Sequence, residues 1–313
     1  MAIPESDNGI AIAIQAQGLS KHYGDLQAVK DLYLTIPHGQ FYGLLGPNGS
    51  GKTTTIHILT TLVRPTAGQA RVAGFEVTTQ PVAVRQAIGL VFQESALDPT
   101  MTVAENLCFA AALYSLPPSL ANQRIDELLT LFNLQNKRQQ RLTALSGGMR
   151  RALDIARGVL HRPQILFLDE PTLGLDIPNR RAIWRFIEQL RREGMTVFLT
   201  THYLEEAEAC DRVDFLKQGR LISGGIPEQL TAKLGDYILE LECGETEAVE
   251  NRLKDRLGSA LREPGFLSFR VTDPQFSFAN LQEELGSTVS AMRWRRPNLN
   301  DVFLWTLSNG VGD

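Results

Sequence analysis

Eight consecutive residues near the start of the chain have the spacing G-x-x-x-x-G-K-T, which is typical of a phosphate-binding loop. They are Gly46, Pro47, Asn48, Gly49, Ser50, Gly51, Lys52 and Thr53. Such a loop folds its backbone N–H groups around anionic oxygens, and the helix that follows adds the partial positive charge of its N-terminus. We expect Lys52 to reach the β- and γ-phosphates of a nucleotide and the Thr53 hydroxyl to bind Mg²⁺.

Two carboxylates follow an apolar segment later in the chain. Residues 165–168 have the composition of a buried strand, and Asp169 and Glu170 come directly after them. The end of such a strand is where a P-loop sheet places the acid that organises Mg²⁺, and Glu170 is suited to polarise an attacking water. Two acids at a strand end could equally be exposed surface residues, but the phosphate-binding loop upstream favours the catalytic interpretation.

A third segment, Leu-Ser-Gly-Gly-Met at 145–149, precedes a helix that we expect over 150–160. Ser146, Gly147 and Gly148 would present a hydroxyl and backbone N–H groups at the N-terminus of that helix, which suits an anion. Taken alone, the serine could be an ordinary helix cap. Its combination with the other two motifs favours a role in nucleotide binding.

The elements that position these residues alternate between strands and helices. Strand-like patterns occur at 10–15, 32–36, 41–45, 70–73, 88–92, 165–168 and 196–199, the first of them alternating like an edge strand. Helices are expected after Gly51, over 150–160, along an apolar stripe of Ile125, Leu128, Leu129 and Phe132, and along a second stripe at 183–190 that Gly194 ends. This alternation predicts an α/β core with a largely parallel sheet.

The pattern breaks at Gly224, Gly225 and Pro227 and resumes as a smaller unit. There we expect strands at 237–243, 266–271 and 289–294 and helices at 247–257 and 278–285. With a boundary at Gly235, the predicted organisation is a loose tail over residues 1–9, a main domain over 10–234 and an accessory α/β domain over 235–313.

The composition of the chain narrows the possible classes of protein. With 43% hydrophobic and 21% charged residues among 313, the chain has the composition of a folded globular protein. Its 31 basic and 35 acidic residues give a net charge of −4, which argues against a nucleic-acid-binding surface. We find no apolar run long enough to span a membrane and no secretion signal, and the three scattered cysteines indicate neither zinc nor a disulfide framework, so we expect a soluble protein of a reducing compartment.

In their order, the three motifs resemble those of the ATP-binding cassette (ABC) ATPases, the nucleotide-hydrolysing subunits of ABC transporters. The resemblance covers about residues 12–234 and is specific, because other P-loop families lack the Leu-Ser-Gly-Gly element. It implies a P-loop NTPase fold of the ABC type, with a mixed sheet core and antiparallel β and α-helical subdomains. The small C-terminal α/β domain would be an addition to that fold.

Smaller motifs agree with this family and extend the expected site. The resemblance implies that Tyr23 stacks on adenine, that Gln93 touches Mg²⁺ and senses the transport partner, and that His202 contacts the γ-phosphate. Leu175-Asp176 matches the loop that crosses to the other subunit. The resemblance thus implies ATP and Mg²⁺ as cofactors, with Glu170, His202 and Lys52 catalytic and Thr53, Gln93 and Asp169 at the metal. The expected nucleotide-binding residues are Tyr23, Gly46, Pro47, Asn48, Gly49, Ser50, Gly51, Lys52, Thr53, Thr54, Gln93, Ser146, Gly147 and Gly148.

The chain is also similar to the drug-resistance branch of ABC exporters, typified by daunorubicin-resistance ATPases. Met149 stands where the wider family usually has Gln, and residues 297–304 are similar to the C-terminal motif of that branch; Ile177 departs from it where Pro is common. The resemblance implies export of a drug-like, lipid or other hydrophobic substrate. It implies an ABC-2-type permease, which we expect to dock at 94–107, and a second ATPase subunit, either identical or homologous, whose Ser146 segment closes over the ATP. The protein would then lie on the cytoplasmic face of the plasma (inner) membrane.

Three other classes of protein are considered. A soluble ABC ATPase acting on ribosomes or DNA usually carries paired cassettes or a long coiled-coil insertion, whereas this chain has one cassette and no heptad tract. A P-loop kinase or GTPase would lack the Leu-Ser-Gly-Gly element, and a GTPase would carry an Asn-Lys-x-Asp motif. A non-catalytic regulatory cassette is disfavoured because Lys52, Asp169, Glu170 and His202 are all present.

Overall fold

The computed structural model describes residues 11–273 and 276–308, so the predicted tail over 1–9 lies outside the described residues. The chain forms two compact units. The first holds the residues up to His202 together with 216–221, and the second holds 203–215 and the residues from 222 onward. The chain passes between the units within β9 (Arg212–Lys217) and β10 (Arg220–Gly225). The domain boundary at Gly235 stays a prediction, because these units are defined by packing and not by a single cut in the chain.

Four parallel strands form the centre of the first unit. Their order in the sheet is β3 (Phe41–Leu45), β8 (Thr196–Thr201), β7 (Ile165–Asp169) and β6 (Ile88–Val91). Every residue of β3, β7 and β8 is buried, as expected for parallel strands covered on both faces. The carboxyl ends of parallel strands meet at one edge, so the residues that follow β3, β7 and β8 come together there.

An antiparallel sheet forms a second part of this unit, in the order β2-β1-β4-β5. Its strands are β1 (Ile12–Tyr23), β2 (Leu26–Pro37), β4 (Ala67–Val72) and β5 (Phe75–Glu76). The prediction of an edge strand at 10–15 is wrong in this respect, because β1 pairs with β2 on one side and β4 on the other. Sequence alternation reports which face of a strand is buried, whereas edge or interior position depends on distant pairing partners.

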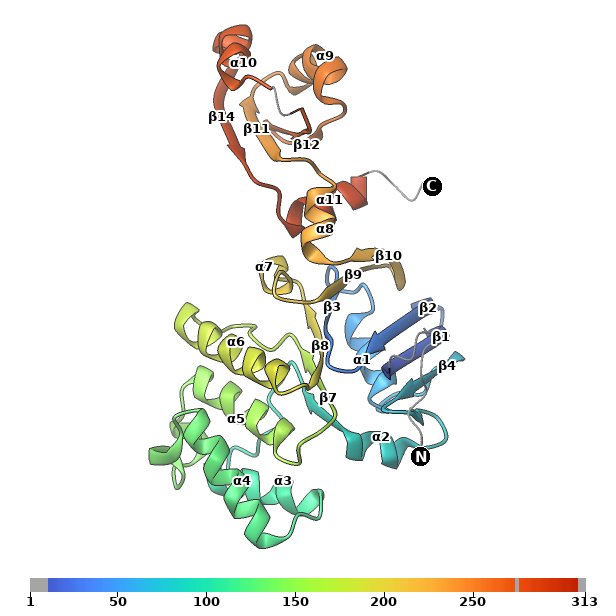
Figure 1. The fold of residues 1–313 in the computed structure, drawn as a ribbon, viewed down its shortest axis with the longest axis vertical. Helices are drawn as coiled ribbons and strands as arrows, with labels where there is room; N and C mark the ends of the chain where they lie inside the picture. Colours follow the sequence, from blue (N-terminus) through green and yellow to red (C-terminus); the bar gives the residue numbers. More distant parts are fainter. Residues whose placement is uncertain (1–10, 274–275, 309–313) are drawn as a thin grey trace. The chain divides into compact units, whose positions relative to one another are not determined.

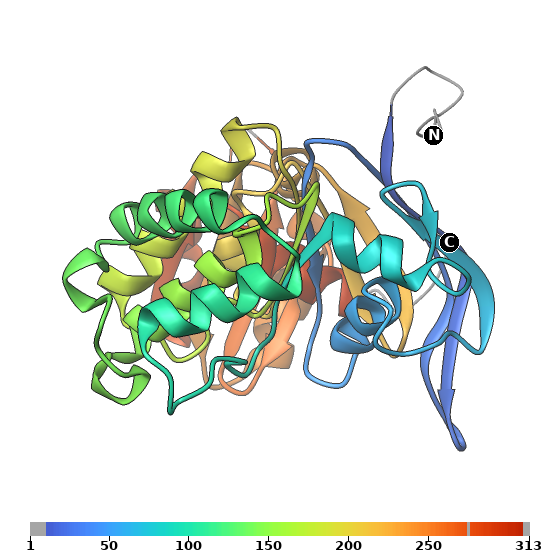
Figure 2. The same ribbon diagram turned by 90° about the horizontal axis from the view of Figure 1, so that it is seen from below.

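Helices cover the parallel strands and build a separate helical layer. The helices of the first unit are α1 (Lys52–Leu59), α2 (Pro81–Ala87), α3 (Val103–Leu113), α4 (Pro118–Leu131), α5 (Gly147–Val159) and α6 (Ile177–Arg192). Apolar residues of α3, α4 and α5, among them Leu107, Ile125 and Leu153, share one buried cluster. Figures 1 and 2 both show α3 and α4, in green, on the side of this unit away from the blue strands β1 and β2. The predicted apolar stripe on α4 is confirmed, since Ile125 and Leu129 are buried.

The second unit contains a four-stranded antiparallel sheet with the chain order β-α-β-β-α-β. It runs through β11 (Tyr237–Cys243), α9 (Thr246–Leu257), β12 (Leu261–Glu263), β13 (Phe266–Val271), α10 (Phe278–Leu285) and β14 (Val289–Arg295). The sheet order β12-β13-β11-β14 is that of a ferredoxin-like unit. The three strands and two helices predicted here are confirmed. Other elements of this unit were not predicted as such, among them the three-residue strand β12, α8 (Pro227–Ala232) and α11 (Leu299–Ser308).

A short helix, α7 (Leu204–Ala207), also belongs to the second unit. Within the described part of the chain, none of the helices has both the length and the apolar character that crossing a membrane requires.

Candidate nucleotide-binding site

The phosphate-binding loop lies between the end of β3 at Leu45 and the start of α1 at Lys52. Two of its glycines are required by close backbone contacts. A Cβ atom at Gly46 would lie 2.2 Å from the carbonyl oxygen of Leu216, and one at Gly51, where φ is 109°, would lie 2.3 Å from that of Ala28. Residues larger than glycine would therefore push the loop away from the structure beneath it.

The loop has the properties of an anion site. The α1 helix begins without a side-chain cap from the described residues, so the N–H groups of its first turn are available. The hydroxyl of Ser50 is buried and has no hydrogen-bond partner within 11–273 and 276–308. A buried polar atom without a partner is costly unless a ligand satisfies it, and phosphate oxygens accept hydrogen bonds. The residues present therefore fit a polyphosphate.

Lys52 supplies a buried positive charge at this loop. Its side chain is 5% exposed, and Nζ donates to the carbonyl oxygens of Gly46 (2.8 Å) and Pro47 (3.2 Å). Burial lowers the pKa of Lys52, while the negative charges of Glu170 and Asp169 oppose that shift. The ammonium group thus lies within the loop, where it can exchange backbone carbonyls for phosphate oxygens.

Asp169 lies at the end of β7, beside the start of α1. It is 2% exposed, accepts a hydrogen bond from the Thr200 hydroxyl and lies 3.5 Å from the Thr53 hydroxyl through Oδ1. A carboxylate and a hydroxyl oxygen at this separation form a donor set that suits a hard cation such as Mg²⁺. The pairing of Thr53 with Asp169 was predicted from sequence, while the second hydroxyl, that of Thr200, was not.

Glu170 lies between two cationic or titratable side chains. Its Oε1 is 3.7 Å from the Lys52 ammonium, and its Oε2 is 3.1 Å from Nδ1 of His202, which follows β8. The backbone of Glu170 has φ 46°, a left-handed conformation that non-glycine residues adopt at a cost. One carboxylate oxygen therefore lies beside Lys52 and the other beside His202. Along the sequence, Lys52 is 118 positions from Glu170 and 150 positions from His202.

One cavity of about 700 Å³ collects most of the predicted nucleotide residues. Its lining includes the loop from Asn48 to Thr54, Tyr23, Gln93, Glu170 and His202. The Tyr23 ring is 46% exposed, and Lys21 Nζ lies 5.0 Å from its centroid. An exposed aromatic ring at the wall of a cavity lined by a phosphate-binding loop is suited to stack on a base.

Ser146, Gly147 and Gly148 do not line this cavity. Ser146 caps α5 by accepting a hydrogen bond from the Met149 N–H, and it is exposed together with Gly147. Gly148 is buried. A Cβ atom there would lie 2.2 Å from the side chain of Asn179 on α6, so the close packing of the two helices requires glycine. Within one chain, the structure thus leaves the Leu-Ser-Gly-Gly segment apart from the phosphate-binding loop.

Sequence reasoning missed several residues of the cavity wall. Leu26, Gln27, Ala28 and Lys30 of β2 line it, as does Gln218. The turn at Gln218 reaches the site because the Gly219 N–H donates to the Ser50 carbonyl oxygen and the Lys30 N–H donates to that of Gly219. No sequence signal marks these residues, since their contribution comes from backbone contacts between distant segments.

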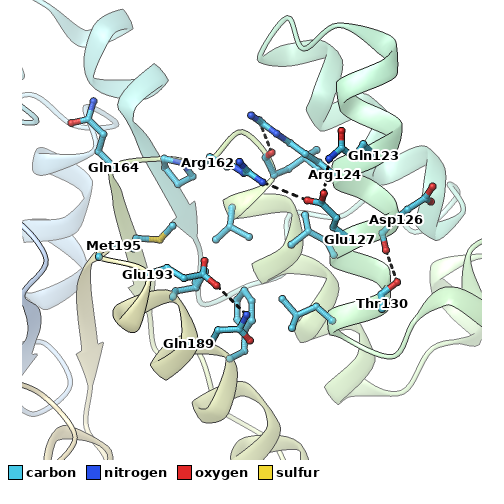
Figure 3. A pocket seen from close by; sticks show the side chains of 18 residues that line it. Gln123, Arg124, Asp126, Glu127, Thr130, Arg162, Gln164, Gln189, Glu193 and Met195 are labelled. Atoms are coloured by element: carbon cyan, nitrogen blue, oxygen red, sulfur yellow. Dashed lines mark hydrogen bonds and ion pairs between the residues drawn. The ribbon is translucent and has the colours of Figure 1, made fainter.

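A second cavity, of about 1160 Å³, lies between α4 and α6, where the chain enters β7 and β8 (Figure 3). Its polar residues bond to one another: Arg162 lies 3.6 Å from Glu127, and Gln189 donates to Glu193. None of the predicted site residues lines this cavity. The residues predicted to bind a nucleotide within one chain therefore lie around the cavity of the phosphate-binding loop and not around this one.

Comparison with known proteins identifies the family. A family model described as ABC transporter matches residues 29–173. The daunorubicin/doxorubicin resistance ATP-binding protein DrrA of Streptomyces peucetius is 39% identical over 302 residues, which are 93% of this chain and 91% of that protein. The chain belongs to the ABC transporter family. Within it, the Nod factor export ATP-binding protein I of Ralstonia nicotianae is 36% identical, with 93% of this chain and 92% of that protein covered.

Solved structures of ABC cassettes have the same fold. A post-hydrolysis dimer of the ATP-binding cassette MJ0796 bound to ADP and Pi matches with a TM-score of 0.63 and 27% identity, covering 68% of this chain and 98% of that one. The predicted ABC-type P-loop fold is confirmed. This chain is an ABC ATPase and the ATP-binding subunit of a transporter, and the alternative of a soluble ATPase acting on ribosomes or DNA is not supported.

The close contact at Gly51 predicts the effect of a single methyl group. Gly51→Ala should weaken ATP binding at least about tenfold, because its Cβ and its φ of 109° both force the loop to move. The measurement is a titration with a fluorescent ATP analogue. Gly258→Ala is the matched control, since it also places alanine at a positive φ, 74°, but nothing lies within 4 Å of the added carbon. An unchanged affinity in Gly51→Ala would contradict the prediction.

Proposed function

We propose that this chain binds Mg²⁺-ATP in the 700 Å³ cavity, hydrolyses it with Glu170 between two cassettes, and thereby powers export of a hydrophobic substrate by a separate ABC-2-type permease. The observation that carries this proposal is the position of the Glu170 carboxylate, 3.7 Å from Lys52 and 3.1 Å from His202 at the phosphate-binding loop. The family relationship and the drug-resistance and export relatives support it.

Binding of ATP would begin at the loop. The polyphosphate would accept hydrogen bonds from the N–H groups of residues 48–54 and from the Ser50 hydroxyl. Lys52 would turn from the carbonyls of Gly46 and Pro47 to the β- and γ-phosphates. Tyr23 would stack on adenine. Thr53, Asp169 and Gln93 would hold Mg²⁺, which neutralises charge on the phosphate oxygens when it is bound.

Hydrolysis needs a water aligned with the γ-phosphate. When Lys52 turns to the phosphates, Oε1 of Glu170 loses its ionic neighbour and can accept a proton from that water. His202, 3.1 Å from Oε2, would hold the γ-phosphate while the negative charge of the transition state develops. Because Glu170 is only 8% exposed, its carboxylate acts where bulk water does not screen it.

A second cassette would complete the site. Ser146 and Gly147 are exposed at the start of α5, outside the cavity of their own chain, which leaves their hydroxyl and N–H groups available to another nucleotide. In the head-to-tail arrangement that we propose, the Ser146 segment of each subunit closes over the ATP held by Lys52 of the other. Hydrolysis then removes the γ-phosphate that both subunits contact.

The permease would dock on α3. In the segment expected for docking, residues 94–96 and 98–100 are exposed, while Val103 and Leu107 are buried in the helical layer. Further along the same helix, two large apolar residues one turn apart are also exposed. These are Phe109, 54% exposed, and Leu113, 66% exposed. Exposed apolar residues on one helix suit an amphipathic cytoplasmic segment of a membrane protein. The chain would therefore lie on the cytoplasmic face of the plasma (inner) membrane as a peripheral subunit.

Glu170→Gln tests the hydrolytic role. The amide cannot accept the proton of the water, so turnover should fall on the order of 10²-fold or more while ATP still binds. Steady-state phosphate release and ATP affinity should be compared with those of Glu228→Gln, which removes an exposed acid on α8 and should behave like wild type. Near-normal hydrolysis by Glu170→Gln would refute the proposed role.

Ser146→Arg tests the two-subunit site. A bulky cation at the start of α5 should abolish ATP-dependent dimers and leave each monomer able to bind ATP. Size-exclusion chromatography with ATP in the Glu170→Gln background is the measurement, because slow turnover preserves the ligand. Ser119→Arg, an exposed position in the first turn of α4, is the control and should still dimerise. Dimers of undiminished stability with Ser146→Arg would overturn the arrangement.

The double substitution Phe109→Asp/Leu113→Asp tests whether α3 is the docking surface. Tagged wild-type protein purified from detergent-solubilised membranes of its native host should recover a multi-span membrane protein, and Phe109→Asp/Leu113→Asp should lose it, since charge on α3 opposes apolar contact. Val82→Asp, which alters an equally exposed apolar residue on α2, serves as the control. Equal recovery by the double variant, with ATP binding intact in all three proteins, would exclude this surface.

A further inference from the structure

Arg151 is a buried arginine whose guanidinium group donates hydrogen bonds to four backbone carbonyls. It lies on α5, five residues after Ser146, and is 7% exposed. Nε donates to the carbonyl oxygen of Pro171, Nη1 to that of Phe92, and Nη2 to those of Asp169 (3.2 Å) and Glu170 (3.1 Å). One side chain thus connects α5 to the ends of β6 and β7.

Three of these carbonyls belong to the strained turn that presents Glu170. Glu170 has φ 46°, and its N–H donates to the Thr200 carbonyl oxygen at 3.0 Å and to the Thr200 hydroxyl at 3.3 Å. The backbone of Glu170 is therefore held by β8 on its N–H side and by Arg151 on its carbonyl side. A left-handed conformation persists only where surrounding contacts determine it in this way.

The same helix holds both ends of the segment that carries Gln93. Arg151 binds the Phe92 carbonyl, Asp154 accepts a hydrogen bond from the Ala96 N–H at 3.3 Å, and Arg157 donates to the Ala96 carbonyl at 3.1 Å. These three side chains follow one another at intervals of three along α5, so they lie on one helical face. A displacement of α5 would therefore move the Gln93 segment and the Glu170 turn together.

We infer that Arg151 is a positioning residue that sets the Glu170 carboxylate for hydrolysis and makes that setting depend on α5. The inference rests on the proposed function, in which Glu170 activates water and Ser146, at the N-terminus of α5, contacts the ATP of the partner subunit. Contact of Ser146 with that ATP would fix α5, and Arg151 would transmit the fixed position to Glu170 and Gln93 of its own chain. Each subunit would then hydrolyse its ATP only when it is also engaged with the other.

Lysine is the informative replacement for Arg151. It keeps the positive charge, but its single ammonium group cannot reach four carbonyls spread around a planar guanidinium group. We expect Arg151→Lys to lower kcat roughly 10- to 100-fold through misplacement of Glu170, while the KM and Kd for ATP change less than about threefold. Arg162→Lys is the control, because Arg162 is an exposed arginine that pairs with Glu127 outside the site.

A thermal unfolding scan separates positioning from a general loss of structure. If Arg151 only stabilised the fold, kcat and ATP affinity of Arg151→Lys would fall together with the unfolding midpoint, and that result would overturn the inference. A kcat within about twofold of wild type would overturn it as well.

A double-mutant cycle tests whether Arg151 acts through Glu170. In the Glu170→Gln background, Arg151→Lys should change the residual single-turnover rate by less than about threefold, because the group that it positions is already absent. If the two reductions multiply while Glu170→Gln alone is slow, the proposed function stands and the inference fails. If Glu170→Gln alone hydrolyses ATP at the wild-type rate, the proposed role of Glu170 fails and the inference falls with it.

Discussion

Three buried charges at one edge of a parallel sheet impose the main constraint on this structure. Lys52, Asp169 and Glu170 are 5%, 2% and 8% exposed, and an isolated ion at such depth would be very costly. Each is tolerated because the others and the surrounding hydroxyl and carbonyl groups compensate it. Removal of any one partner would leave a buried charge without compensation, so the positions of β3, β7 and β8 are constrained together.

The contacts of Lys52 could also change when a polyphosphate binds. In this structure, Lys52 is satisfied by Gly46, Pro47 and Glu170. A polyphosphate offers stronger acceptors for the same ammonium group, and its binding would free Glu170 for a water molecule. In the proposed function, nucleotide binding at the loop would therefore also prepare Glu170 to act as the general base.

The α5 helix connects the two ends of this chemistry. Its first residues are exposed and present Ser146 and Gly147, while its buried face holds backbone groups on both sides of Gln93 and around Glu170. Gly148 packs against Asn179, which also ties the start of α5 to α6. In the proposed function, α5 would therefore link the surface that meets another subunit to the site of hydrolysis.

The reactive side chains of the candidate site and the type of fold were predictable from the amino-acid sequence. The spacing of the glycines, Lys52 and Thr53 predicted a phosphate-binding loop, and the apolar runs that end at Leu45 and Leu168 predicted buried parallel strands, because these properties depend on neighbours along the chain. Which distant groups meet could be known only from the folded chain. The interior position of β1, the approach of Gln218 and the hydroxyl of Thr200 to the site, and the four carbonyls bound by Arg151 all depend on pairing and packing between segments far apart in sequence, for which no local pattern exists.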